Sequence, residues 1–320
     1  MGIAKRGLRG MMVWSMAASV AVIAGCAGRT STIGAGGRVQ PAEKPAAAAP
    51  ASDSSQAATP PAPAVAATTP SAPLSARAQA DQYWARRANP DTARLALAAY
   101  NEAALTGADA ALLARLSRAH YLVANYVETD NAKKDSLFLK GVEIAERAMS
   151  TDPAFVKSYQ ETKDEKKAVQ ALGMSHIDAI YWYSANLGKW ASTKSLMVRL
   201  GNKSKLEAYN KRVLDLDEKY FHGAPHRFFG ALPTKVPGGD LKVSKAHFEK
   251  AIAIEPNYFG TRTLFAELYA TKARDKDVFV KQLDYVLAGD PASLPDSEPE
   301  NRYEQAFAKQ LKEKVNEWFD

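Results

Sequence analysis

The sequence predicts an all-α domain built from paired helices, preceded by a signal segment and an unstructured tether. From Leu74 onward, apolar residues recur at spacings of three and four, and no stretch alternates with a period of two as a half-buried strand would. Helix-forming Ala, Leu, Lys and Glu dominate this region. Proline disrupts a helix interior and disfavours helical geometry in the preceding residue. Helix breaks are therefore expected at Asn89-Pro90, Asp152-Pro153, Gly223-Ala224-Pro225, Pro233 to Gly239, Glu255-Pro256 and Asp290-Pro291.

The first 25 residues have the layout of a secretory signal. Basic residues precede an apolar run, Met11 to Ala24, which ends in small residues. That run is shorter than the roughly 20 apolar residues of a membrane-spanning helix. Ile23-Ala24-Gly25-Cys26 resembles the bacterial lipobox, whose cysteine becomes the first mature residue and carries acyl chains. Two or more such chains bind a membrane stably. The sequence thus predicts a signal peptide over residues 1–25 and lipidation of Cys26, with an ordinary signal peptide and a chance cysteine as the alternative.

We interpret residues 26–76 as the acylated cysteine followed by a disordered tether. Ala, Pro, Ser, Thr and Gly fill this stretch, and large apolar side chains are nearly absent. Such a composition cannot bury enough apolar surface to offset the entropy lost on ordering the chain. A coil of this length reaches about 40 Å, so the helical domain, residues 77–320, is expected to stand clear of the membrane surface.

A residue pattern near several helix ends predicts degenerate tetratricopeptide-like repeats, an α-solenoid. A small or apolar residue is followed by apolar residues four and seven positions later and by a proline five positions after that. This matches the second half of the tetratricopeptide repeat, whose period is 34 residues. The pattern occurs at Ser244, Phe248, Ala251, Pro256; at Phe279, Leu283, Val286, Pro291; at Gly141, Ala145, Ala148, Pro153; and, without proline, at Ala96, Tyr100, Ala103, Ala108. An irregular helical bundle is the alternative, because the 103 residues from Ala145 to Phe248 are no multiple of 34.

The charge balance argues against nucleic acid as a partner. The chain has 42 basic and 35 acidic residues and a net charge of +7, but residues 77–320 carry only +3. A nucleic-acid-binding domain concentrates basic charge on one face, whereas the charged runs at 163–167 and 309–314 mix both signs. Because Cys26 is the only cysteine, packing rather than disulfide bonds must stabilise the domain.

No arrangement of residues indicates an enzyme, a metal site or a cofactor. The only thiol is assigned to lipid, and the chain contains neither a Gly-x-Ser-x-Gly motif nor a phosphate-binding glycine loop. His222 and His226 have the i, i+4 spacing of zinc ligands on a helix. Gly223 and Pro225 between them are expected to break that helix face.

One predicted helix, His176 to Trp190, is apolar and aromatic on nearly all sides. Such a helix is either central in the core or lines an interface or cavity. Trp and Tyr combine apolar area with a polar group and are frequent at binding sites. The sequence leaves both interpretations open. Its binding candidates are Tyr181, Trp182, Asn186 and Trp190, of which Trp190 is expected to be the exposed one because it lies beside Lys189 near the helix end.

A second aromatic-rich stretch, Tyr220 to Gly230, combines four aromatic residues with an arginine and helix breakers. This composition predicts a shaped corner of the chain. The corner is either core packing at a turn between repeats or one wall of a binding cleft. Its candidates are Arg227, Phe228 and Phe229.

These two segments resemble a known family. Residues 179–190 (AIYWYSANLGKW) and the runs Gly223 to Arg227, Pro237 to Asp240 and Ala246 to Ile252 are similar to the signature of the T component of tripartite ATP-independent periplasmic (TRAP) transporters. The resemblance spans roughly residues 80–318 and includes the lipobox. It implies a tetratricopeptide-like lipoprotein that forms a homotrimer with a central pore. It further implies a periplasmic solute-binding protein as partner and a hydrophobic small molecule as ligand. The long Ala/Pro tether departs from the family pattern.

Two hypotheses about function follow. In the first, a membrane-anchored periplasmic lipoprotein docks the solute-binding protein of a TRAP-type system and handles a hydrophobic solute. In the second, an outer-membrane tetratricopeptide scaffold binds peptides or assembly partners. A closed apolar cavity near Trp182 would favour the first, and a polar concave surface the second. Because Ala27 rather than an aspartate follows the lipidated cysteine, the expected location is the inner face of the outer membrane.

Overall fold

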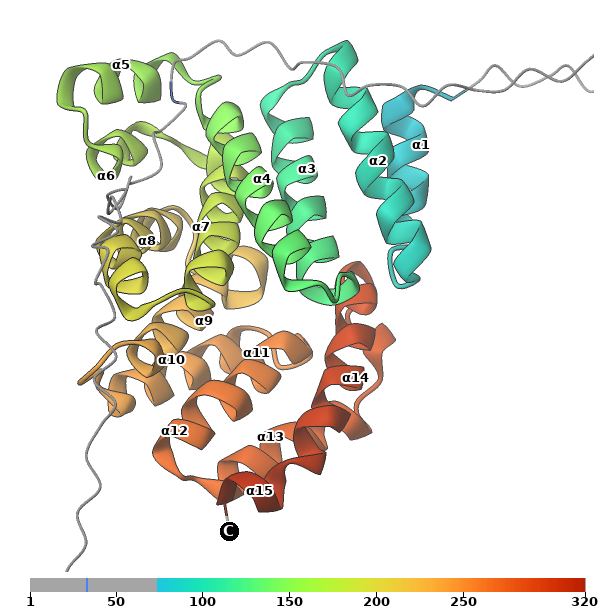
Figure 1. The fold of residues 1–320 in the computed structure, drawn as a ribbon, viewed down its shortest axis with the longest axis vertical. Coiled ribbons are helices and arrows are strands. Elements are labelled where there is room, and N and C mark those ends of the chain that lie inside the picture. Colours follow the sequence, from blue (N-terminus) through green and yellow to red (C-terminus); the bar gives the residue numbers. More distant parts are fainter. Residues whose placement is uncertain (1–32, 34–73, 320) are drawn as a thin grey trace, which may run out of the picture. The chain divides into compact units, whose positions relative to one another are not determined.

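The computed structural model describes Ile33 and residues 74–319. The predicted signal peptide, Cys26 and the tether apart from Ile33 and residues 74–76 lie outside the described residues. Within it, the regular elements are helices and no strand occurs, so the predicted all-α fold is confirmed (Figure 1). None of the described helices has both the length and the apolar character needed to cross a membrane.

The helices follow one another in a simple order along the chain. They are α1 (Ala76–Ala85), α2 (Pro90–Thr106), α3 (Ala110–Leu122), η1 (Val123–Val127), α4 (Asn131–Met149), α5 (Pro153–Thr162), α6 (Glu165–Ala168), η2 (Val169–Ala171), η3 (Met174–His176), α7 (Ile177–Ser192), α8 (Leu196–Leu216), α9 (Tyr220–Lys235), α10 (Leu241–Ile254), α11 (Phe259–Leu264), η4 (Phe265–Ala270), α12 (Thr271–Ala273), α13 (Lys276–Ala288), η5 (Pro291–Ser293), η6 (Pro295–Ser297), α14 (Glu298–Glu313) and α15 (Val315–Phe319).

Several predicted breaks are helix starts in the structure. Asn89 caps α2, because its side chain accepts hydrogen bonds from the backbone N–H groups of Asp91 and Thr92, and Pro90 takes the first helical position. Asp152 and Pro153 begin α5 in the same way. Proline suits this position because the first N–H groups of a helix have no intrahelical partner.

Consecutive helices pack in pairs: α1 with α2, α3 with α4, α7 with α8, and α9 with α10. The residues of the repeat pattern lie where each pair meets. Ser244, Phe248 and Ala251 of α10 have no exposed surface, and the Ser244 hydroxyl donates to the Gly230 carbonyl of α9 at 2.6 Å. The irregular spacing before α10 has a structural reason, since the short helices α5 and α6 are inserted between the α3/α4 and α7/α8 pairs.

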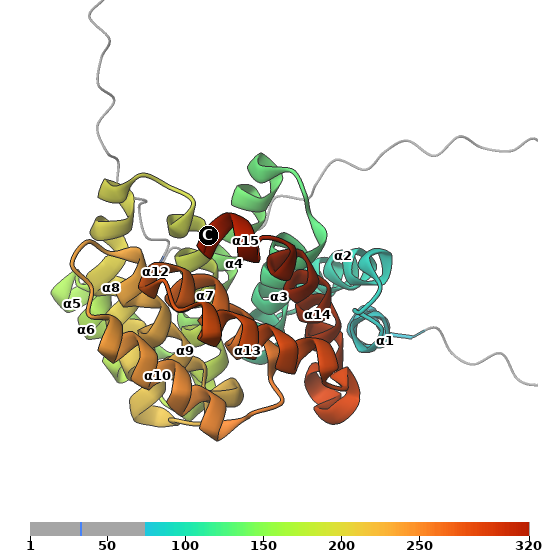
Figure 2. The ribbon, with the colours of Figure 1, turned by 90° about the horizontal axis from the view of Figure 1, so that it is seen from below.

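The last long helix returns to the first pairs (Figures 1 and 2). From α14, the Tyr303 hydroxyl donates to the Arg87 carbonyl just after α1 at 2.9 Å. The ring of Tyr303 also stacks on Tyr126 of η1, with centroids 5.0 Å apart. The buried apolar core has two parts, one from α1 to α8 and one from α10 to α14. The space between these parts contains the cavity described next.

Candidate ligand cavity

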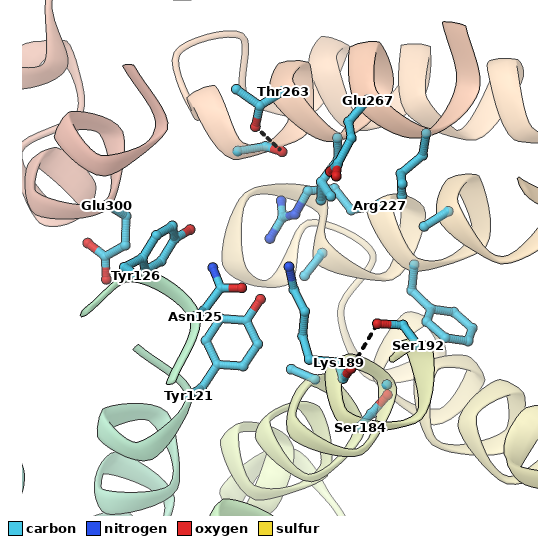
Figure 3. A pocket seen from close by; sticks show the side chains of 18 of the residues that line it. Tyr121, Asn125, Tyr126, Ser184, Lys189, Ser192, Arg227, Thr263, Glu267 and Glu300 are labelled. Carbon is cyan, nitrogen blue, oxygen red and sulfur yellow. Dashed lines mark hydrogen bonds between the residues drawn. The ribbon is translucent and has the colours of Figure 1, made fainter. Parts of the chain in front are cut away.

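A cavity of about 640 Å³ lies between the two parts of the core. Its walls come from α3, η1, α7, α8, α9, α11, η4 and α14, so it is assembled from both halves of the domain (Figure 3). The volume lies within the roughly 300–1,000 Å³ of small-molecule sites. Its aromatic lining is Tyr121, Tyr126, Tyr181, Trp182, Phe221, Phe228, Tyr258, Tyr303 and Phe307.

Trp182 stands at the centre of the aromatic wall. Its ring centroid lies 5.3 Å from Tyr121 of α3 and 5.2 Å from Phe221, which lies in the corner at the start of α9. The adjacent Tyr181 ring is 4.7 Å away in an edge-on arrangement. The Trp182 side chain is only 5% exposed, because neighbouring rings cover most of it and only a small part of its surface remains for the cavity. Three segments distant in sequence thus form one apolar wall.

The corner that carries Phe221 has an unusual backbone. Phe221, His222 and Gly223 all have positive φ, at 42°, 62° and 74°, although this region is costly for residues other than glycine. A Cβ at Gly223 would meet the Ala251 Cα at 3.2 Å, so glycine is needed there on both grounds. Arg227 stabilises the corner by donating to the carbonyls of Phe221 and His222 at 2.7 and 2.5 Å. Because of this corner, His222 and His226 do not lie one turn apart on a single helix face, as two zinc ligands would.

Two π-helical turns face the cavity. η1 contributes Asn125 and Tyr126, and η4 contributes Glu267 and Leu268. A π-turn widens a helix locally and is frequent at functional sites. η1 ends the helix that begins as α3, and η4 lies between α11 and α12.

An ion triad closes the end of the cavity near α14. Glu300 accepts from the Arg87 guanidinium at 2.8 Å and from Arg118 at 2.8 Å. Burial alone would raise the pKa of Glu300, but the charges of Arg118 and Arg87 outweigh it and lower the pKa below its ordinary value. One helical turn later, burial raises the pKa of Glu304 despite hydrogen bonds from Thr263 and Tyr126. Glu300 is therefore a buried anion, whereas Glu304 favours its neutral form more than an ordinary glutamate does.

The structure brings four of the seven predicted binding candidates to the cavity: Tyr181, Trp182, Arg227 and Phe228. It places Asn186, Trp190 and Phe229 outside the lining.

Asn186 is fully buried between helices, where its amide donates to the Ser117 hydroxyl at 3.1 Å and the Trp182 carbonyl at 2.8 Å. Trp190 is half-buried, with the Lys194 ammonium 5.7 Å from its ring centroid. Phe229 packs on His247 at 5.6 Å. Arg118, Glu300 and Glu304 also line the cavity but carry no sequence signal, because one basic residue and two glutamates four apart in a helix are also typical of exposed helix faces.

Comparison with protein families gives one match. The sequence model described as TRAP transporter T-component matches residues 118–319. The matched region begins at Arg118 and contains the whole lining of this cavity. Comparison with curated proteins finds no match.

Proposed function

Because the chain belongs to the TRAP transporter T-component family, we propose that it is a lipid-anchored periplasmic component of a TRAP system that binds a hydrophobic solute in its cavity. One observation carries the solute proposal: a space of about 640 Å³ whose walls are built around Trp182. The aromatic rings of that wall offer apolar area together with the polar groups of Tyr and Trp. A peptide-binding scaffold would instead need a polar concave surface. The aromatic lining of the cavity therefore supports the scaffold hypothesis less.

The partner and the anchor are part of the same proposal. The cavity would exchange its solute with a periplasmic solute-binding protein that docks on this domain, and the protein would act as a homotrimer. Lipidation of Cys26 would hold it at the inner face of the outer membrane. The test of the partner is a pull-down from a periplasmic extract under conditions that retain trimers. We expect a solute-binding protein to be recovered, and recovery of none contradicts the docking proposal.

Filling the cavity tests the solute proposal. Gly188 of α7 lines the cavity, and a Cβ built on it would meet only Leu206 at 3.9 Å, so a side chain can leave the backbone there without a clash. The probe is N-phenyl-1-naphthylamine, a neutral apolar dye that fluoresces when it leaves water. Gly188→Leu is expected to weaken dye binding at least about tenfold, the effect of losing about 1.4 kcal/mol of contact.

Gly201→Leu is the matched control for this experiment. Gly201 lies in the next helix, α8, and a Cβ there meets nothing within 4 Å. Both changes replace a helical glycine, so each should leave stability unchanged or raise it by about 0.5–1 kcal/mol. Dye binding that is equal in Gly188→Leu and Gly201→Leu would contradict the proposal that the cavity is the solute site.

A further inference from the structure

Positive charge without a counter-ion collects at one end of the cavity. Lys189 of α7, Arg199 of α8 and Lys235 of α9 all line it, and within residues 74–319 none of them forms an ion pair. Figure 3 shows Lys189 extending toward the middle of the cavity, in the direction of Arg227. The Nε atom of Arg199 is buried and has no hydrogen-bond partner among the described residues. These three side chains form what we call the cationic end.

The three cations are close enough to act on one another. Desolvation lowers the pKa of Lys235, and the charges of Lys189 and Arg199 lower it further against the opposing effect of Glu267. Two carboxylates of the lining act on these cations, Glu267 on Lys235 and Glu304 on Lys189. Glu304 already accepts hydrogen bonds from Thr263 and Tyr126, and burial raises its pKa, so positive charge remains in excess even if Glu267 neutralises one cation.

Of the four other cations of the lining, Lys134 stands singly on α4, and the remaining three have partners. Arg118 is paired with Glu300 at 2.8 Å, and Lys203 with Glu207 at 2.6 Å. Arg227 donates to two backbone carbonyls. The cationic end is therefore the part of the cavity where several unbalanced charges face the ligand space together, and α7 carries both Lys189 of this end and Trp182 of the aromatic wall. A ligand that satisfies both must have an apolar body and an anionic head.

We propose that the ligand is an anionic amphiphile, with its negatively charged head at Lys189, Arg199 and Lys235 and its apolar body against the aromatic wall. This inference rests on the proposed function, because it names the chemical class of the solute for the same cavity. A negative head contributes charge-assisted hydrogen bonds, which are roughly twice as strong as neutral ones. Three cations on three helices also fix the position of the head and so the orientation of the ligand.

Two dyes with one scaffold test the inference. 8-Anilinonaphthalene-1-sulfonate carries a sulfonate on the ring system of the neutral N-phenyl-1-naphthylamine. The anionic dye is expected to bind the wild-type protein at least about tenfold more tightly. Dodecanoate should displace the anionic dye more effectively than dodecanol does. This comparison tests whether a carboxylate can also bind at the cationic end. Raising the salt concentration should reduce the preference only in part, because Lys189 and Arg199 are partly buried and are screened less than exposed charges such as Lys235.

Substitution of the cationic end provides the specific test. In the triple variant Lys189→Met, Arg199→Met, Lys235→Met, unbranched apolar side chains replace the three charged ones. It should weaken the anionic dye at least about tenfold while changing neutral-dye binding less than about twofold. The control, Lys140→Ala, Lys157→Ala, Lys245→Ala, removes three lysines outside the lining, each near a glutamate of its own helix, and should leave both dyes unaffected. If the triple variant does not fold, the exposed Lys235→Met alone should still lower the preference for the anionic dye severalfold.

The outcomes separate this inference from the proposed function. Equal affinities of the wild-type protein for the two dyes would refute the anionic head and leave the apolar cavity intact. Equal losses in the cationic-end and control variants would refute the assigned position. If neither dye binds, the proposed function fails as well.

Discussion

Replacing Glu300 by glutamine should unfold the protein at a markedly lower temperature. The Glu300 carboxylate joins α14 to the start of the domain, accepting from Arg87 Nε at 3.1 Å and Nη2 at 2.8 Å and from Arg118 Nη2 at 2.8 Å. The side chains of Glu300 and Arg87 are only 5% and 7% exposed. Glutamine keeps the shape of this site but leaves the Arg87 charge buried without a counter-ion.

The magnitude follows from that burial. Removing one partner of a buried ion pair costs about 3–5 kcal/mol. In a domain of this size, each kcal/mol lowers the melting temperature by about 2–4 °C, so the expected decrease is about 6–20 °C. The control is Glu298→Gln on the same helix, where the carboxylate pairs with Arg302 on the surface. That exposed pair is worth at most about 1 kcal/mol.

The pH dependence of the melts gives a second readout. The folded pKa of Glu300 lies below its ordinary value because Arg118 and Arg87 outweigh the effect of burial. The stability due to its charge is therefore present above the ordinary glutamate pKa of about 4.3 and is lost as pH falls through the folded value. Glu300→Gln should lose that part of the acid sensitivity. If Glu300→Gln melts no lower than Glu298→Gln, the triad does not hold the two ends together.

Two further predictions concern a histidine and the two tryptophans of α7. Burial lowers the pKa of His120 to about 3, so protonation of this histidine favours the unfolded chain. The stability due to its neutral form is fully present above about pH 6.5. Between that pH and pH 3 it is lost at about 1.4 kcal/mol per pH unit. Both ring nitrogens of His120 are buried without a partner in the described part of the chain. His120→Leu should therefore be at least as stable as the wild-type protein at neutral pH and should lose stability less steeply on acidification. Urea unfolding between pH 7 and 4 measures both effects, and equal slopes of stability against pH would contradict the assignment. Trp182→Ala should cost about 3–5 kcal/mol and weaken neutral-dye binding, whereas the half-buried Trp190 lies outside the cavity, so Trp190→Ala should cost less and leave binding unchanged. Paired melts and dye titrations decide this, and equal loss of binding in the two variants would refute the placement.

Local signals predicted the paired helices because local chemistry determines them. Asn89-Pro90 and Asp152-Pro153 cap helices in the structure for the reason that made them breaks in the sequence. The small residue Ser244 marks a close helix contact because its hydroxyl reaches the backbone of the neighbouring helix. These features depend on residues that are near one another in the chain.

Long-range contacts determine the cavity, and these were not predictable from spacing. Arg87 and Glu300 are 213 residues apart in the sequence, so neither one marks the other. Periodicity placed Asn186 among the aromatic candidates, but Gly141 and Ser117 from two other helices enclose it in the core. The break at Gly223 was predicted, whereas the left-handed Phe221 and His222 depend on Arg227 and on packing against other helices.

A crystal structure of the protein grown with N-phenyl-1-naphthylamine tests the central claim most directly. We expect one bound dye inside the cavity, with its rings in contact with Trp182 and Phe228, both of which line it. The competing location is the exposed apolar face of α8, where Leu196, Met197 and Leu200 are 39%, 75% and 41% exposed. Density for the dye on that face, with the cavity empty, would contradict the account.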